Sequence, residues 1–125
     1  GGCRDCHTPV KNGQPLPGQT FAGGELFDTK LGKVVSANIT PDVETGIGKW
    51  SEEFFLKKFY DYKDYAEKGS PNSPGPEAFT LMPWLAFSQR PPDELAAIYT
   101  YLKAQPAVKN YVEIHRGFPN KPAVP

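Results

Sequence analysis

Two segments of the chain place apolar residues at the spacing of an amphipathic helix. In the first, Phe55 and Phe59 lie four residues apart and share one apolar face. Ser51 is a favourable N-cap for this helix, and Trp50 before it can pack on Phe55 as a hydrophobic staple. The pattern predicts a helix that begins after Ser51 and fades within residues 60–68.

The second helical segment lies later in the chain. It is expected to begin near Pro92, because proline suits the first turn of a helix, and to end before Pro106. Its apolar residues recur at the i, i+3, i+4, i+7 spacing of a buried face: Leu95, Ile98, Tyr99 and Leu102.

Two short apolar segments are candidates for strands. Residues 25–27 and 33–35 flank a turn at residues 28–32, which predicts one small β-hairpin. Fourteen prolines and twelve glycines among 125 residues predict loops elsewhere, chiefly at residues 8–24 and 69–78. The patterns together predict one compact domain with short helices and many loops.

Charge and hydropathy exclude two classes of protein. Fourteen basic and fourteen acidic residues give a net charge of zero, so no basic surface for nucleic acid is indicated. The mean hydropathy is −0.51, and no apolar run approaches the length of a membrane span.

Both cysteines of the chain lie in one short motif, Cys3-Arg4-Asp5-Cys6-His7. The C-x-x-C-H spacing is the attachment signature of a c-type haem. Each thiol can form a thioether with a haem vinyl group, and the histidine then becomes the proximal iron ligand. We expect a backbone carbonyl of residues 9–17 to accept the His7 Nδ1 proton and fix the ring tautomer.

Other uses of the two cysteines agree less well with the sequence. A closed zinc site needs four nitrogen or sulfur ligands, and His115 is the one remaining candidate beyond Cys3, Cys6 and His7. A thioredoxin-like redox pair needs a βαβ context, which does not follow here. A disulfide between the two cysteines would leave His7 unexplained.

Met82 is the candidate for the sixth iron ligand. It is the single methionine of the chain and lies between a proline-rich loop and Pro83, where the backbone can be held rigid. Methionine raises the reduction potential relative to histidine. The rivals are an open sixth site and His115, whose place in a polar tail predicts an exposed side chain. Replacing Met82 is expected to lower the potential, and replacing His115 is expected to leave it unchanged.

The chain resembles class I cytochrome c in three places: the motif at residues 3–7, the pair at residues 82–83 and the helix expected at residues 93–102. Residues 21–24 and 38–51 resemble more closely the cytochrome c domains of bacterial membrane-associated dehydrogenase subunits, of the alcohol and gluconate type. The resemblance covers roughly residues 1–105.

The resemblance implies an all-α fold with one haem c bound through Cys3 and Cys6 and held by His7 and Met82. It also implies that three more residues lie near the haem edge or its propionates: Asn38, Thr40 and Trp50. Residues 1–106 are expected to form the haem domain, with most of its N-terminal helix missing, and residues 107–125 an extended tail.

The predicted function is electron transfer by a monohaem protein, because no catalytic triad or phosphate-binding loop is visible. Its partners would be a dehydrogenase, an oxidase or another cytochrome. Haem c is normally attached outside the cytoplasm, so we expect a periplasmic site or the outer face of the inner membrane, with a targeting segment removed or not included. The alternatives are a haem peroxidase and a gas-binding sensor, both with an open or labile sixth site.

Overall fold

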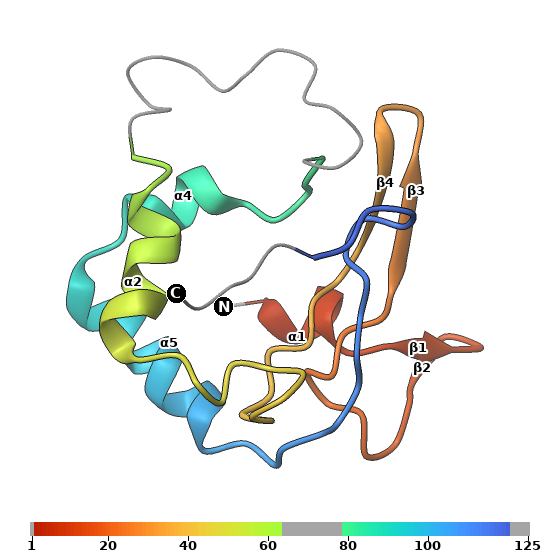
Figure 1. Ribbon diagram of the computed structural model, residues 1–125, viewed down its shortest axis with the longest axis horizontal. Helices are drawn as coiled ribbons and strands as arrows, with labels where there is room; N and C mark the ends of the chain where they lie inside the picture. Colours follow the sequence, from red (N-terminus) through yellow and green to blue (C-terminus); the bar gives the residue numbers. More distant parts are fainter. Residues whose placement is uncertain (1, 64–78, 121–125) are drawn as a thin grey trace.

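The computed structural model describes residues 2–63 and 79–120. In chain order its elements are α1 (Cys3–His7), β1 (Val10–Lys11), β2 (Gln14–Pro15), β3 (Leu26–Thr29), β4 (Gly32–Val35), α2 (Glu52–Tyr60), α4 (Trp84–Ser88) and α5 (Pro92–Lys103). Figure 1 shows α2, α4 and α5 grouped on one side, the strands on the other, and α1 between them.

The expected all-α fold class is wrong, because the described residues form two small antiparallel sheets as well as helices. The β3–β4 hairpin lies where one was predicted, with Thr29 paired to Gly32 across a shorter turn. The β1–β2 hairpin lies inside the predicted loop at residues 8–24. Its turn residues Asn12 and Gly13 have φ values of 53° and 78°, as a two-residue type I′ turn requires.

The two predicted helices are confirmed as α2 and α5. The Ser51 side chain caps α2 by accepting a hydrogen bond from the Phe54 backbone N–H at 3.1 Å. The ring centroids of Trp50 and Phe55 lie 6.4 Å apart, as expected for a hydrophobic staple. Helix α5 begins at Pro92, with its acidic residues in the first turn.

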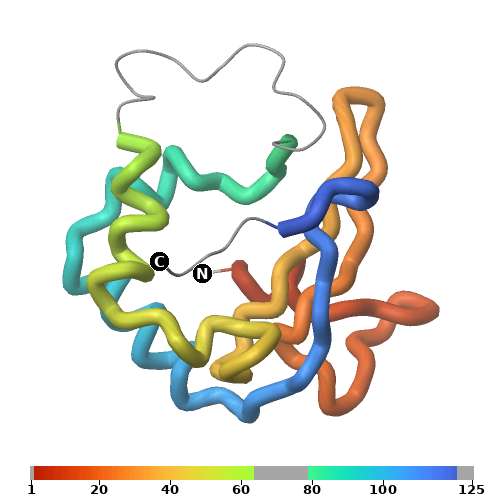
Figure 2. The backbone as a smooth tube through the Cα atoms, viewed as in Figure 1, coloured from red at the N-terminus to blue at the C-terminus, as the bar shows by residue number. Residues whose placement is uncertain are grey.

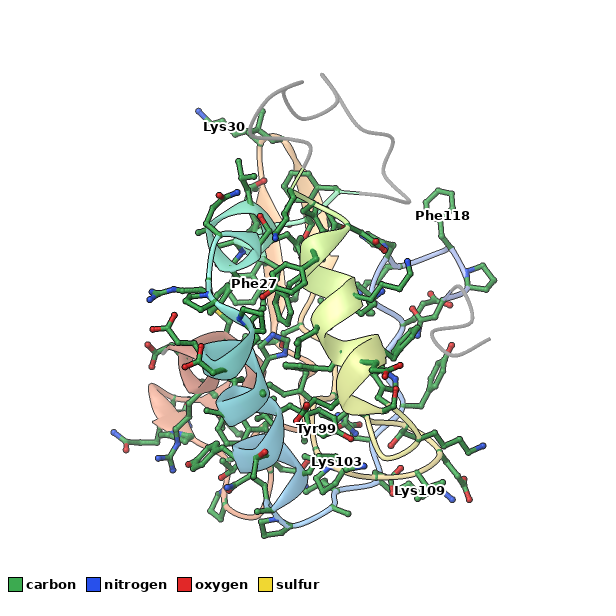
Figure 3. The ribbon with its side chains drawn as sticks, turned by 90° about the vertical axis from the view of Figure 1, so that its left-hand side faces the viewer. Phe27, Lys30, Tyr99, Lys103, Lys109 and Phe118 are labelled. Atoms are coloured by element: carbon green, nitrogen blue, oxygen red, sulfur yellow. The ribbon has the colours of Figure 1, made fainter. Side chains whose placement is uncertain are left out.

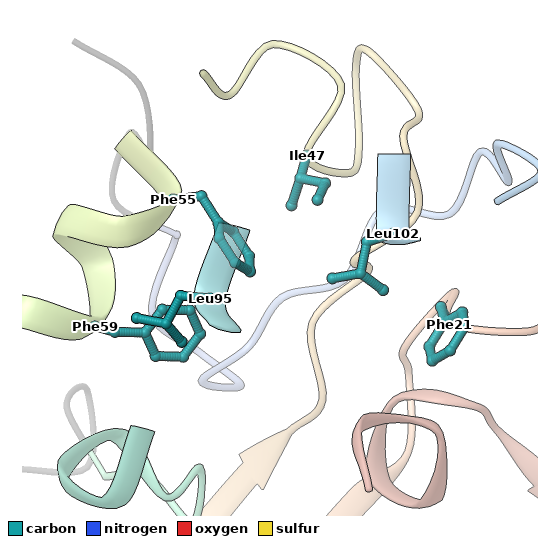
Figure 4. Packing of buried hydrophobic residues seen from close by; sticks show 6 residues of the cluster. All are labelled: Phe21, Ile47, Phe55, Phe59, Leu95 and Leu102. Atoms are coloured by element: carbon teal, nitrogen blue, oxygen red, sulfur yellow. The ribbon is translucent and has the colours of Figure 1, made fainter. Parts of the chain in front are cut away.

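The core is one cluster of buried apolar side chains between the helices and the segment after α1. Partly buried residues from distant parts of the chain pack against it, among them Cys3 and Met82. Burial of such side chains is the main stabilising term for a domain of this size. Figure 4 shows the six buried members: Phe21, Ile47, Phe55, Phe59, Leu95 and Leu102.

Helix α5 also fixes the loop that precedes α2. Tyr99 donates a hydrogen bond from its hydroxyl to the Trp50 carbonyl at 2.6 Å, and Lys103 donates to the Gly48 carbonyl at 2.8 Å. Both side chains extend from α5 in Figure 3. The loop carrying Ile47 is thereby attached to the helix that buries Leu95.

After α5 the chain returns to the strand side of the molecule, where its last described residues lie beside β3 and β4 (Figure 2). The Val35 backbone N–H donates to the Ile114 carbonyl at 2.8 Å, and Val112 is buried. The described part of the predicted tail is therefore bonded to the rest of the domain. Residues 121–125, and the loop predicted at residues 69–78, lie outside the described residues.

Within residues 2–63 and 79–120, no helix has both the length and the apolar character needed to cross a lipid bilayer.

Candidate functional site

The C-x-x-C-H motif forms α1, a single helical turn. Gly2 is its N-cap residue and has a left-handed backbone conformation, with φ at 76°. Cys3 is half-buried and Cys6 is exposed, and no disulfide joins them. The two cysteines therefore share one helical turn but differ in surroundings, because Cys3 also packs against the apolar core and Cys6 does not.

His7 is held by a carbonyl that the sequence did not indicate. Its Nδ1 lies 2.6 Å from the carbonyl oxygen of Ala37, thirty residues further along the chain. The expectation of an acceptor within residues 9–17 is therefore wrong. A carbonyl can only accept, so Nδ1 carries the proton and Nε2 keeps its lone pair. Nε2 has no hydrogen bond to any described residue.

Burial of the His7 side chain also changes its pKa. The pKa of His7 is lowered from its usual value by desolvation, an effect that exceeds the raising effect of the hydrogen bond to Ala37. A lowered pKa keeps the imidazole neutral at physiological pH, which is the form that binds a metal.

Gly23 allows Ala37 to come this close to His7. The Gly23 backbone N–H donates to the His7 carbonyl at 2.7 Å. A Cβ at Gly23 would lie 2.4 Å from the Ala37 carbonyl carbon and 2.5 Å from the Ser36 oxygen. Only a residue without a side chain fits there, so Gly23 is the sequence signal for this contact.

Met82 lies in a short turn that its neighbours hold in place. The Thr80 hydroxyl accepts hydrogen bonds from the Met82 backbone N–H at 3.1 Å and from Trp84 Nε1 at 3.2 Å. The Met82 carbonyl in turn accepts from the Trp84 backbone N–H at 2.8 Å. Met82 is half-buried and packs against the same apolar cluster as Cys3.

Asn38 and Thr40 are buried and bonded to other parts of the protein. Asn38 Nδ2 donates to the Thr45 hydroxyl and to the carbonyls of Val108 and Asn110, at 2.8–3.1 Å. Asn38 Oδ1 accepts from the backbone and hydroxyl of Thr40. These bonds attach the segment after α5 to the middle of the chain. Haem contact by Asn38 and Thr40 stays a prediction.

Replacing Asn38 with alanine is expected to lower the free energy of unfolding by about 3 kcal/mol, because it removes a buried side chain together with its bonds to buried Thr40 and to the half-buried carbonyls of residues 108 and 110. Urea unfolding of the two proteins measures the change. The matched control is Gln105→Ala, since the Gln105 side chain makes one exposed bond, to the Tyr101 carbonyl. It should cost less than about 0.5 kcal/mol. Equal losses would contradict the structural role of Asn38.

Trp50, the third residue implied by the resemblance, lies in the aromatic group at the start of α2. Its ring meets Phe54 edge-on at 5.0 Å between centroids, and the Lys58 ammonium lies 5.8 Å from its ring centroid. Trp50 packs against the same apolar cluster as Cys3 and Met82. A position near a haem edge stays a prediction for it.

His115 is less exposed than its place in a polar tail predicts. Its side chain is half-buried, and Nε2 lies 2.6 Å from the Phe79 carbonyl oxygen. The described parts of the chain hold no group of three or more His, Cys, Asp or Glu side chains placed to bind a metal ion. His115 is therefore not brought together with Cys3, Cys6 and His7 into the four-ligand set of the zinc alternative.

The residues at α1 and at Met82 fit a c-type haem. Both cysteines belong to the helical turn that ends at His7, and the tautomer of His7 leaves Nε2 able to bind iron. Met82, which packs against the same apolar cluster as Cys3, carries a thioether of the kind that would bind haem iron. The aromatic and aliphatic side chains of that cluster can also bury a flat apolar ring.

No protein-family model matches the chain. Among curated proteins, the chain is 34% identical over 109 residues to one of the subunits of nicotinate dehydrogenase from Pseudomonas putida, covering 87% of this chain and 8% of that protein. It is 35% identical over 101 residues to the gluconate 2-dehydrogenase cytochrome c subunit of Pantoea cypripedii, covering 81% and 20%.

A third relative is the cytochrome c subunit of the quinone-dependent alcohol dehydrogenase of Gluconobacter oxydans, 33% identical over 99 residues and covering 79% of this chain and 18% of that protein. The chain thus spans a fifth or less of the length of these relatives. Over most of its own length, the chain is a relative of one segment of the cytochrome c subunits of dehydrogenases.

Proposed function

We propose that this chain binds one haem c covalently and transfers single electrons. In this proposal Cys3 and Cys6 form the two thioethers, and His7 and Met82 are the axial ligands. The observation that carries it is the hydrogen bond from His7 Nδ1 to the Ala37 carbonyl, which leaves the Nε2 lone pair available for a ligand. When bound, the haem supplies the one-electron couple between ferrous and ferric iron.

The residues of the chain would set the conditions for that couple. The Ala37 carbonyl makes His7 a more basic ligand by accepting its Nδ1 proton. Met82 raises the potential relative to a second histidine. The apolar cluster that Cys3 and Met82 contact would exclude water and lower the local dielectric constant, which disfavours the more highly charged ferric state.

Exposure of Cys6 indicates where electrons would enter or leave. Cys3 faces the apolar cluster, whereas Cys6 is exposed on α1. A redox partner would therefore approach the surface around Cys6 and α1. Such encounters use small and transient contacts, and a net charge of zero provides little long-range attraction by total charge.

The relatives favour a dehydrogenase as the partner. They include cytochrome subunits of gluconate, alcohol and fructose dehydrogenases. We propose that this chain likewise passes electrons from a dehydrogenase to a later acceptor, as part of a larger complex or beside it. Because haem c is attached outside the cytoplasm, we place this activity in the periplasm or at the outer face of the inner membrane.

Covalent attachment can be tested directly by mass. Produced together with a haem c maturation system, the chain is expected to keep the mass of one haem after denaturation. Replacing both Cys3 and Cys6 with serine should remove that mass, because the thioethers need the sulfur atoms. Replacing either one alone should leave a single thioether and a shifted spectrum of the reduced protein.

Arg4→Ala is the matched control, since Arg4 is exposed on the same turn of α1 and carries no thiol. It should leave the attached mass unchanged. A matured sample without added mass would contradict the proposal. A haem-loaded sample with a high-spin ferric spectrum and peroxide turnover would instead favour the peroxidase alternative.

A further inference from the structure

The last described segment of the chain forms a strap, residues 112–118, that is bonded to itself and to β4. The Phe118 backbone N–H donates to the His115 carbonyl at 2.9 Å, and the Gly117 N–H donates to Glu113 Oε1 at 2.8 Å. The Ile114 carbonyl accepts from the Val35 N–H of β4. The strap is therefore a compact turn fixed on the hairpin, as Figure 2 shows for its path beside β3 and β4.

His115 connects this strap to the segment that carries Met82. Its Nε2 lies 2.6 Å from the Phe79 carbonyl oxygen, a contact between residues 36 apart in the sequence. A carbonyl can only accept, so His115 is the donor. Met82 follows Phe79 closely in the chain, and a bond at Phe79 therefore restricts where Met82 can lie.

The Phe79 side chain is fixed by the hairpin itself. It is 7% exposed, and its ring lies over Gly32 so closely that a Cβ on Gly32 would come within 2.8 Å of it. The Thr80 hydroxyl then accepts from the Met82 N–H. The start of the Met82 segment is held by β4 and the strap, and its other end continues into α4.

The same hairpin supports the opposite ligand. Strand β4 ends at Val35, and Ala37, two residues later, accepts the Nδ1 proton of His7. Val35 is also the residue bonded to Ile114 of the strap. A continuous set of contacts thus runs from His7 through Ala37, β4 and the strap to the segment of Met82.

We propose that His115 is a positioning residue for Met82: through the Phe79 carbonyl it holds the methionine segment at a fixed distance from the hairpin that supports His7. The inference rests on the proposed haem function, and it gives His115 a role that the sequence pattern did not indicate. It replaces the expectation that a substitution at His115 has no effect on the haem site. His115 acts here on the methionine segment and not as an iron ligand.

The test compares two variants of the haem-loaded chain. His115→Phe keeps a ring but has no donor, whereas His115→Gln keeps an N–H that can reach the Phe79 carbonyl. Loss of a short, half-buried hydrogen bond should speed the binding of added imidazole to ferric iron by roughly tenfold or more in His115→Phe. The weak far-red absorption band of methionine-ligated ferric iron should also weaken. His115→Gln should restore both readouts.

Tyr111→Ala is the matched control, because Tyr111 lies just before the strap and its side chain is 66% exposed. Tyr111→Ala should bind imidazole at the rate of the unsubstituted protein and keep the far-red band. If His115→Phe binds imidazole at the rate of the unchanged chain, the inference is overturned while the proposed function stands. If the unchanged chain lacks the far-red band, the methionine ligation itself fails, and the two failures are thus distinguishable.

A second measurement needs no substitution at His115. Hydrogen exchange in increasing denaturant follows the Val35 amide, whose proton is bonded to the strap. The inference expects this amide to lose protection at the same denaturant concentration at which the far-red band disappears. Release of the Val35 amide while the band stays intact would overturn it, even if His115→Phe does not fold.

Discussion

Replacing Gly23 with alanine is expected to destabilise the fold by more than about 4 kcal/mol, a large part of the stability of a domain of this size. The new Cβ would meet the Ala37 carbonyl carbon at 2.4 Å and the Ser36 oxygen at 2.5 Å, and both are backbone atoms. The backbone at Gly23 also has a φ of 73°, which favours glycine. Urea or thermal unfolding measures the loss.

Gly18→Ala separates the two causes. Gly18 has nearly the same φ, 72°, but a Cβ there would meet nothing within 4 Å. It should therefore show only the conformational cost, about 1 kcal/mol. The difference between the two variants is the steric cost of moving Ala37, and a similar loss in both would contradict the close approach.

Gly23→Ala should also change the site, because the carbonyl that it displaces is the one that accepts the His7 proton. In folded, haem-loaded protein, the proximal histidine would lose its orienting partner. The expected result is a shifted reduction potential in addition to the lower stability. Gly18→Ala should leave the potential unchanged.

The helices could be predicted because their determinants are local. Ser51 caps α2 through its own side chain, and Phe55 and Phe59 bury the face that their spacing indicates. In α5, Leu95 and Leu102 lie seven residues apart and are both buried. Apolar spacing and capping act within a few residues, so they can be recognised without knowing the rest of the fold.

The all-α prediction is wrong because the short β1–β2 hairpin has little local signal in the sequence. The resemblance implies an all-α fold, and the many prolines and glycines after His7 predict a loop at residues 8–24. Asn12 and Gly13, with positive φ, form the turn of a hairpin in that stretch. The dipeptide is a strong hairpin signal, but strands of two residues each provide almost no apolar pattern to support it.

The contacts that complete the site are long-range and could not be found from local patterns. Ala37 meets His7 across 30 residues, and His115 meets Phe79 across 36. Each involves a backbone carbonyl, which every residue type possesses, so the acceptor has no sequence signal of its own. The glycine that makes the first contact possible, Gly23, does have one, because its missing side chain is required.

Met82→Leu is expected to lower the reduction potential by on the order of 0.1 V or more, since axial ligand identity sets haem potentials over a range of about 0.8 V. Leucine has nearly the volume of methionine and should keep the contacts with the apolar cluster. The substitution therefore removes the sulfur ligand without emptying the site. Protein-film voltammetry measures the potential, and carbon monoxide binding to the reduced protein reports an open sixth position.

Leu81→Ala is the matched control for this prediction, because Leu81 precedes Met82 and is 48% exposed. It should change neither the potential nor the rate of carbon monoxide binding. If Met82→Leu leaves both unchanged in haem-loaded protein, the sixth ligand is another group. Removing the sulfur should have two effects at once, because it makes the ferric state relatively more stable and frees one coordination position on the iron. A lower potential without faster carbon monoxide binding would therefore indicate that a different side chain has replaced Met82 on the iron.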